Sequence, residues 1–401
     1  MANKNAQNTE TQNSANHSAN NPESNPGSNI VRDAKLANLQ YFKDKGIDPY
    51  PNNFALTHKA AQLQEKYANL EDGEQTEDSV KVAGRIMAYR NSGMFIDLVD
   101  SSGKIQIFSH KQDIEPEQLE DIGHYDLGDI IGVEGYVRRT PRGELTINAK
   151  STQMLTKSLQ PLPEKHHGLS DIEQRYRQRY LDLIANPEVR ETFLARTNII
   201  ATFRKVLNDK DYVEVETPVL HPIPGGTSAE PFVTEHNALD MTLYLRIATE
   251  LYLKRLVVGG LADGVYEMGR TFRNEGISVK HNPEFTMLEV YVAYADYRDM
   301  MNLTEELVEA ASIAVNGTTK VTFQGKEIDF KAPWPRKPMT GLIKEACGTD
   351  FMEITDLDAA RAKAEELELD LNPNDPALNW GKIVEAAFEK FVEGDLIQPT
   401  H

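Results

Sequence analysis

The 401-residue sequence contains a single cysteine, Cys347, and no long apolar run. One cysteine excludes both an internal disulfide framework and a zinc site built on several thiolates. No stretch of about eighteen apolar residues occurs, and the N-terminus is polar and Asn-rich instead of a charged-then-apolar leader. We therefore expect no membrane segment and no secretion, which leaves the cytoplasm as the expected compartment.

Common nucleotide-binding and hydrolase signatures are absent too. The sequence has neither a Gly-x4-Gly-Lys-Ser/Thr phosphate loop nor a Gly-x-Gly-x-x-Gly fingerprint, which argues against P-loop and Rossmann enzymes. It also lacks a His-Glu-x-x-His helix and a Gly-x-Ser-x-Gly elbow. If the protein binds a nucleotide, it must do so through a motif other than these.

Positive charge is scarce, since the formal net charge is −19. An excess of acids argues against a nucleic-acid partner, because phosphate contacts need clustered Lys and Arg. Nearly half of the excess, however, lies in residues 341–401. Two basic clusters remain elsewhere: Arg175–Arg179, and a group made of Arg270, Arg273, Lys280 and His281.

Changes in composition along the chain predict five segments. Residues 1–30 are rich in Asn, Gln and Ser and offer almost nothing to bury, so we expect a disordered tail. Residues 31–75 carry apolar side chains at helical spacing, and residues 76–157 alternate as strands do. A connector with a basic helical stretch follows over 158–187, and residues 188–401 form the last domain.

The alternating segment predicts a small barrel. Val80–Ala88, Phe95–Leu98, Ile105–Phe108, Ile131–Val137 and Leu145–Ile147 read as five strands, which is typical of a closed barrel of the oligonucleotide-binding (OB) type. The face opposite the apolar one carries a cation, aromatic rings and polar groups suited to unpaired bases: Arg85, Phe95, Gln106, Phe108 and Glu144. A plain barrel with two exposed phenylalanines explains the same pattern.

The last domain mixes helices and strands. An amphipathic helix around Phe193–Leu207 precedes a strand that Pro218 stops, and a second strand, Met241–Arg246, leads into a helix capped by Thr249. Two further strands, Val265–Phe272 and Phe285–Tyr291, flank a polar loop. Antiparallel connections of this kind favour an α+β fold over a doubly wound parallel sheet.

That loop and its return strand hold the candidate chemistry. Arg273, Glu275 and His281 put a guanidinium, a carboxylate and an imidazole into one loop, where arginine can grip a phosphate. Glu289 and Tyr291 are two residues apart and so project from one face of a strand, where they could bind an ammonium group. Each residue also has a purely structural explanation, such as a cross-strand ion pair for Glu289.

Several strings extend this pattern into a resemblance. Ile223-Pro-Gly-Gly-Thr-Ser-Ala229, Tyr244-Leu-Arg-Ile-Ala248 and Phe272-Arg-Asn-Glu275 through Glu289 closely resemble bacterial class II lysyl-tRNA synthetases. The resemblance runs from about residue 31 to the end of the sequence and includes the barrel. It implies an α+β class II catalytic domain, with an antiparallel sheet, behind an OB-fold anticodon-binding domain over 76–157.

The resemblance implies a lysine–tRNA ligase that forms lysyl-adenylate from ATP and L-lysine and transfers lysine to tRNA(Lys), with Mg2+ on the triphosphate and a homodimer as the assembly. The catalytic residues are Arg273, Glu275 and His281. The remaining implied roles are ATP binding by Arg273, Glu275, His281, Asn282 and Phe285; lysine binding by Gly226, Glu250, Arg273, Glu289 and Tyr291; and anticodon binding by Arg85, Phe95, Gln106 and Glu144.

The sequence departs from the family where it stops, at His401. The acidic magnesium ligands and the third class II motif do not occur, so no metal ligand is expected within these residues, and the catalytic domain is expected to be truncated. An inert RNA-binding fragment is therefore the alternative function. A ligase for aspartate or asparagine is disfavoured, because Glu250 and Glu289 would repel an anionic side chain. Residues 341–395 resemble the helical acidic insertion of the family.

Overall fold

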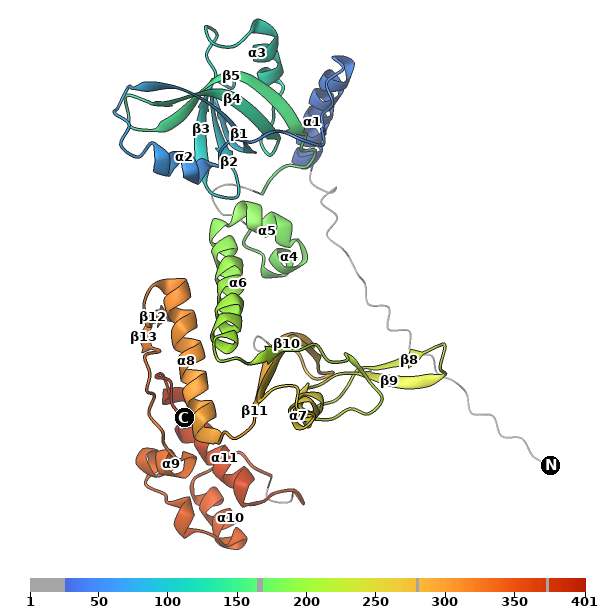
Figure 1. Ribbon diagram of the computed structural model, residues 1–401, viewed down its shortest axis with the longest axis vertical. Coiled ribbons are helices and arrows are strands. Elements are labelled where there is room, and N and C mark those ends of the chain that lie inside the picture. Colours follow the sequence, from blue (N-terminus) through green and yellow to red (C-terminus); the bar gives the residue numbers. More distant parts are fainter. Residues whose placement is uncertain (1–25, 164–168, 279–280, 373–374) are drawn as a thin grey trace, which may run out of the picture. The chain divides into compact units, whose positions relative to one another are not determined.

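The computed structural model describes residues 26–163, 169–278, 281–372 and 375–401 (Figure 1). They form two compact units, the first ending at Pro187 and the second running from Glu188 to His401. Most of the expected tail, residues 1–25, lies outside the described residues. Residues 26–30 do not belong to a tail, because helix α1 (Pro26–Asp44) begins at Pro26. Proline suits the first helical turn, where its fixed φ fits and its missing N–H is not needed.

Two N-terminal helices, α1 and α2 (Ala60–Lys66), pack against the barrel. Phe42 of α1 and Leu63 of α2 are fully buried in the barrel's apolar core. Lys35 is also buried, and its ammonium donates to the carbonyls of Leu127 at 2.6 Å and Ser158 at 3.3 Å. Burial lowers the pKa of Lys35. Both helices are thus part of the first unit's core.

The predicted five-stranded barrel is confirmed. Its strands are β1 (Gln75–Arg90), β2 (Phe95–Val99), β3 (Lys104–Phe108), β4 (Ile130–Arg139) and β5 (Leu145–Thr156), paired in the order β1-β2-β3-β5-β4 with β4 closing onto β1. The pair β3·β5 is parallel, and the other pairs are antiparallel. Alternate residues of β1 point inward, as expected from the sequence.

The barrel differs from expectation at two places. Strand β5 continues to Thr156, well beyond the expected Ile147. The sequence pattern ends early because a register shift opposite Glu134 and Gly135 breaks the alternation of β5, and because the second half of the strand is largely polar. A Cβ at Gly135 would overlap the Asn148 carbonyl, so glycine is needed for this close pairing. Helix α3 (Pro116–Gly123), between β3 and β4, was not predicted.

The connector holds two short helices instead of one. Helices α4 (Ile172–Arg177) and α5 (Arg179–Ala185) meet at Gln178, whose backbone leaves the helical region. The buried carboxylate of Asp182 joins them, since it accepts from Nε of Arg175 at 2.7 Å and from Arg179.

The second unit begins with helix α6 (Pro187–Asn208) and a three-stranded sheet. Strand β10 (Gly264–Phe272) pairs antiparallel with β11 (Glu284–Val292) and parallel with the short β6 (Val213–Glu214). The strand expected over Tyr212–Pro218 is thus only two residues long. Pro218 cannot donate to a ladder, and the Thr217 side chain instead donates to Glu267 at 2.6 Å.

A second small sheet and helix α7 stand beside β10 and β11. Strands β7 (Leu220–His221), β9 (Met241–Leu245) and β8 (Val233–His236) pair in that order, and α7 spans Glu250–Val258. Thr249 occupies the cap position of α7, but its hydroxyl accepts no amide of the helix. The predicted side-chain cap is therefore wrong.

The remainder of the second unit is largely helical. Helix α8 (Tyr297–Asn316) buries Leu303 and Leu307 against Leu207 and Tyr266, and a hairpin, β12 (Lys320–Phe323) and β13 (Lys326–Asp329), follows it. Helices α9 (Met339–Cys347), α10 (Leu357–Glu366) and α11 (Trp380–Phe391) enclose an apolar core of their own. The two ends of the segment that holds these three helices lie side by side. The amide of Lys337 donates to the His401 carbonyl at 2.7 Å, and the amide of His401 donates to the Pro335 carbonyl at 2.9 Å.

Among the described helices, none has both the length and the apolar character needed to cross a membrane.

Candidate functional site

The paired strands β10 and β11 present one polar face. Their register sets Val265 opposite Tyr291, Glu267 opposite Glu289 and Thr271 opposite Phe285. Alternate residues of a strand share a face, so Glu289 and Tyr291 project together. They also touch, since the Tyr291 hydroxyl donates to Oε2 of Glu289 at 2.9 Å.

The start of α7 completes this cluster. The other oxygen of Glu289 accepts the backbone amide of Thr249 at 2.9 Å, which places Glu250 in the adjacent first turn. Gly226 lies against the same turn with a φ of +97°, and a Cβ there would stand 2.9 Å from Cβ of Ala248 and 3.3 Å from Cβ of Glu250. Gly226, Glu250, Glu289 and Tyr291 are hereafter called the carboxylate cluster.

The charges of the carboxylate cluster favour a positive group beside it. Burial, the hydrogen bond to Glu289 and the charge of Glu250 raise the pKa of Tyr291, so the phenol stays protonated and donates. The ammonium of Lys254 pairs with Glu250 and stands 5.7 Å from the centroid of the Tyr291 ring. A positive group of the protein therefore already lies beside the two carboxylates.

Arg273 and Phe285 form a second pair at the other end of these strands. The guanidinium carbon of Arg273 lies 5.2 Å from the centroid of the Phe285 ring. Its Nε is buried with no hydrogen-bond partner among the described residues, and none of the ion pairs found there involves it. Bonds from the Arg273 amide to Pro283 and from the Asn274 amide to Glu230 fix the backbone. An arginine held on a ring without a carboxylate is suited to an anion.

The remaining predicted residues of the loop are exposed. His281 shares a hydrogen bond of 2.7 Å with the Ser278 hydroxyl, through Nδ1. Glu275 and Asn282 lie at the surface. Within the described residues no hydrogen bond or ion pair joins their side chains to Arg273, so the structure pairs Arg273 with Phe285 but not with Glu275, His281 or Asn282.

Sequence reasoning missed a buried ionic network on this same face. Arg246, 3 % exposed, pairs with Glu267, 4 % exposed, and donates through Nε to the Arg270 carbonyl at 2.8 Å. A Cβ at Gly269 would overlap the Arg246 guanidinium, so glycine is required there. The buried arginine thereby ties the end of β9 to β10, where Glu267 lies directly opposite Glu289. The only signal was a charged residue at the end of the largely apolar stretch Met241–Arg246.

On the barrel, three of the four predicted residues share one face. The rings of Phe95 and Phe108 lie 5.0 Å apart, Oε1 of Gln106 accepts the Thr146 hydroxyl at 3.0 Å, and Glu144 pairs with Lys104 at 3.0 Å. Sequence reasoning missed Arg138, whose guanidinium stands 5.3 Å from the Phe108 ring and whose Nε is buried without a partner among the described residues. The alternation of β4 could have placed it on this face.

Arg85 lies apart from the other three. It pairs with Val99, at the opposite end of β2 from Phe95, which is roughly 13 Å along the strand at 3.3 Å per residue. Its guanidinium donates to the Gly128 carbonyl at 2.7 Å, and burial lowers its pKa. In this structure the Arg85 side chain is therefore hydrogen-bonded to the backbone of its own domain.

Comparison with known proteins gives the family. A family model described as "tRNA synthetases class II (D, K and N)" matches residues 171–380, and one described as "OB-fold nucleic acid binding domain" matches 80–155. A lysine–tRNA ligase of Pelotomaculum thermopropionicum is 53 % identical over 92 % of this chain and 72 % of the relative. The chain belongs to the lysine–tRNA ligase family. Relatives from Carboxydothermus hydrogenoformans (51 % identical, 93 % of this chain, 75 % of the relative) and Sinorhizobium medicae (49 %, 93 % and 74 %) bear the same name.

Membership of this family accounts for both units. The class II match takes in the carboxylate cluster, Arg273 and Phe285, and the OB-fold match takes in Phe95, Phe108 and Gln106. It also confirms the predicted fold class, an OB-type barrel followed by an α+β class II synthetase domain.

Proposed function

We propose that this chain acts as a lysine–tRNA ligase, activating L-lysine with ATP and transferring it to tRNA(Lys). The observation that carries the proposal is the carboxylate cluster, in which Glu250, Glu289 and the protonated Tyr291 converge on one spot. Two carboxylates and a phenol suit the ammonium groups of lysine. They would repel the carboxylate of aspartate.

Lysine binding divides between the two carboxylates. Glu250, in the first turn of α7 beside Gly226, takes the α-ammonium, while Glu289 and Tyr291 take the side-chain ammonium. Gly226 leaves room for the substrate backbone next to Glu250, because any side chain there would fill that space.

ATP binds at the other end of the strands. Arg273 contacts the α-phosphate and the lysine carboxylate, and Phe285 stacks on adenine. A carboxylate oxygen of the substrate attacks the α-phosphorus, the bond from the α-phosphorus to the bridging oxygen breaks, and pyrophosphate leaves, while Arg273 stabilises the negative charge that develops on the α-phosphate. Glu275, His281 and Asn282 contact other ATP groups when the loop folds over the nucleotide.

Magnesium has no protein ligand set among the described residues, where no group of three His, Cys, Asp or Glu side chains could hold a metal ion. The donors present thus do not fit the magnesium expected for the family, and we derive no step through it.

The barrel binds the anticodon of the tRNA. Phe95 and Phe108 offer ring faces for unpaired bases, while Gln106 and Glu144 supply hydrogen-bond acceptors at their edges. Arg138 adds positive charge over Phe108. Arg85 joins this surface only if it leaves the Gly128 carbonyl.

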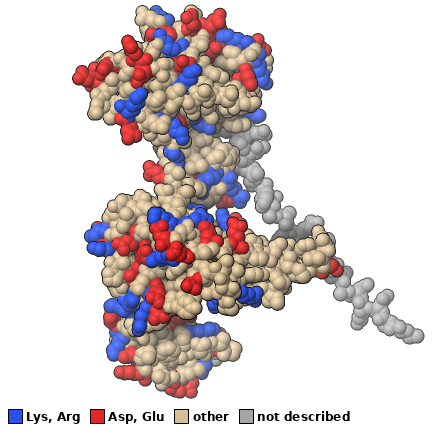
Figure 2. All heavy atoms as spheres, viewed as in Figure 1, with Lys and Arg blue, Asp and Glu red and all other residues tan. Residues whose placement is uncertain are grey.

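A homodimer is the assembly we propose. The β8–β9 hairpin is largely uncharged on the face seen in Figure 2 and exposes Val233, Leu239 and Met241. Helix α6 exposes Phe193 and Leu194 as well. Apolar surface of this extent is typical of an interface. Sedimentation of the full chain at several concentrations would test it, with a monomer at all concentrations as the contrary result.

The function is tested by amino-acid-dependent ATP–pyrophosphate exchange with the full chain, using lysine, aspartate and asparagine in parallel. Exchange with lysine alone supports the proposal, and exchange with aspartate or asparagine overturns the assignment of Glu250 and Glu289. Aminoacylation and a filter-binding assay with tRNA(Lys) complete the set. Retained tRNA binding by a folded chain without exchange would identify the RNA-binding alternative.

A further inference from the structure

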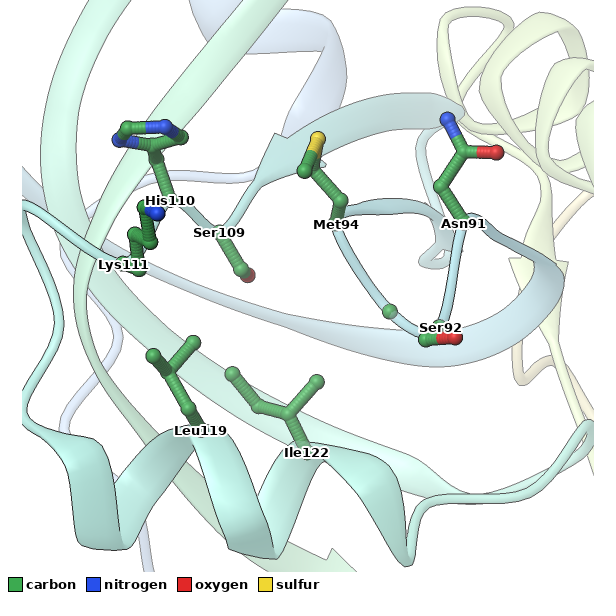
Figure 3. Close-up of a pocket in the computed structure, with 9 residues that line it drawn as sticks. Asn91, Ser92, Met94, Ser109, His110, Lys111, Leu119 and Ile122 are labelled. Carbon is green, nitrogen blue, oxygen red and sulfur yellow. The ribbon is translucent and has the colours of Figure 1, made fainter.

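A cavity of about 260 Å³ opens beside the aromatic face of the barrel (Figure 3). One wall is the turn between β1 and β2, another is the segment that follows β3, and helix α3 forms the floor. Its lining residues are Asn91, Ser92, Gly93, Met94, Ser109, His110, Lys111, Leu119 and Ile122. The volume is below the roughly 300–1,000 Å³ of pockets for drug-sized ligands, so a single small ring system fits it better.

Ser109 marks this cavity as more than a packing gap. The residue is 3 % exposed, and its hydroxyl is buried without a hydrogen-bond partner among the described residues. Its own amide donates to the Met94 carbonyl at 2.8 Å, which fixes the serine at the end of the β2·β3 ladder. A buried hydroxyl with no partner is destabilising, and a ligand that hydrogen-bonds to it removes that penalty.

The backbone around the cavity is built to keep it open. Asn91, Ser92 and Gly93 all have positive φ, and a Cβ on Gly93 would overlap Ile122 and stand 2.8 Å from the Tyr89 hydroxyl. That hydroxyl donates to the Ile122 carbonyl at 2.7 Å and so ties the turn to α3. The turn and the helix therefore hold a fixed spacing.

The cavity is continuous with the surface that we propose to bind RNA. His110, one of its lining residues, stacks on Phe108 with ring centroids 5.7 Å apart, and Phe108 in turn contacts Phe95. An aromatic row thus leads from the barrel face to the cavity rim. Lys111 is exposed at this rim, where an ammonium can meet a phosphate.

The chemistry of the walls fits a nucleobase. Met94, Leu119 and Ile122 supply apolar contacts for a planar ring, and the Ser109 hydroxyl can donate to or accept from one polar edge. We propose that this cavity receives one base of the bound RNA, next to the base that stacks on Phe95 and Phe108. The inference rests on the proposed function, because it requires the barrel to bind the anticodon loop.

The test uses the full chain and a fluorescent RNA stem-loop that carries the lysine anticodon. Binding is measured by anisotropy for the intact loop and for loops that each lack one base. We expect one base deletion that weakens wild-type binding about tenfold, as loss of a stacked base does. In Ser109→Leu, whose side chain fills the cavity, the same deletion should have less than a twofold effect. Ser101→Ala, at the exposed β2–β3 turn, is the matched control.

Ser109→Ala keeps the experiment decisive if the leucine variant fails to fold, because it removes only the hydroxyl. In Ser109→Ala the loss of affinity caused by the base deletion should be about fivefold smaller than in the wild type. Equal deletion effects in wild type and both Ser109 variants would overturn the cavity proposal. If Phe95→Ala weakens RNA binding in that case, the proposed role of the barrel in RNA binding survives. If Phe95→Ala binds the intact loop as tightly as the wild type does, both the cavity proposal and the proposed RNA role of the barrel are overturned. If free uridine or adenosine monophosphate binds at Ser109 and no base deletion has an effect, the ligand of the cavity is a free nucleotide and not RNA.

Discussion

The carboxylate of Glu289 and the amide of Thr249 are joined by a 2.9 Å hydrogen bond between strand β11 and the start of α7. This bond satisfies the amide of the N-cap residue itself, whereas the side-chain cap that Thr249 does not provide would have accepted an amide of the first helical turn. It holds the Glu289 carboxylate against the backbone that precedes Glu250, the other acid of the carboxylate cluster. The spacing of the two acids is thus fixed by the fold and does not depend on the substrate.

Replacing Glu289 tests this arrangement. Glu289→Gln keeps an acceptor for Thr249 but removes the charge, so we expect the KM for lysine in pyrophosphate exchange to rise about 100-fold with a smaller change in the KM for ATP. Glu284→Gln, exposed on the same strand, is the control and should leave both constants unchanged. A rise confined to the KM for ATP would contradict the assignment.

Arg273 gives a prediction about the chemical step. Arg273→Lys keeps the charge but loses the planar fork over Phe285, so kcat for exchange should fall by roughly 10²–10³ with a modest effect on lysine binding. Arg270→Lys, at an exposed position of β10 three residues before Arg273, serves as the comparison. Wild-type kcat in the Arg273 variant would show that the guanidinium does not face the reacting phosphate.

Gly226 gives a prediction about both stability and lysine binding. Gly226→Ala forces a side chain into a left-handed backbone, which costs about 1–2 kcal/mol, and sets its Cβ against Glu250. We expect both a lower midpoint of thermal unfolding and a higher KM for lysine. Gly225→Ala has no positive φ and meets only the flexible end of Leu251. It should be milder in both readouts, and equal effects would argue against a special role for Gly226.

His221 predicts a pH dependence of stability. The residue is buried, its Nε2 donates to the Pro218 carbonyl at 2.8 Å, and burial lowers its pKa. Below about pH 6.5 the unfolded chain takes up a proton that the folded chain refuses, so stability falls as the pH drops from 6.5 toward the lowered pKa. Thermal unfolding at pH 7.5 and 5.5 should show a difference that His221→Asn reduces. His58→Asn, in the other unit, should retain the full difference.

The sequence predicts the parts of this protein that depend on local periodicity. Strand alternation placed Glu289 and Tyr291 on one face, and it gave the five strands of the barrel. It could not bring Gly226 next to Glu250, because that contact depends on how a loop folds back onto α7. The resemblance to the family suggested the pairing, and the structure shows why a glycine is there.

The position of Arg85 along its strand could not be predicted from alternation. Alternation gives only the side of β1 from which Arg85 projects, and the register sets it opposite Val99, at the other end of β2 from Phe95, where it donates to the Gly128 carbonyl.

The backbone bonds that join Pro335 and Lys337 to His401 make the helical group α9–α11 a detachable module. Because its two ends lie side by side and its apolar core is its own, this helical group can change without moving a strand of the sheet. Loop-closure entropy grows only slowly with length, so helices can be gained or lost here at little expense to the rest of the fold. Evolution can therefore vary the size of this module while the geometry around Arg273 and Glu289 stays constant.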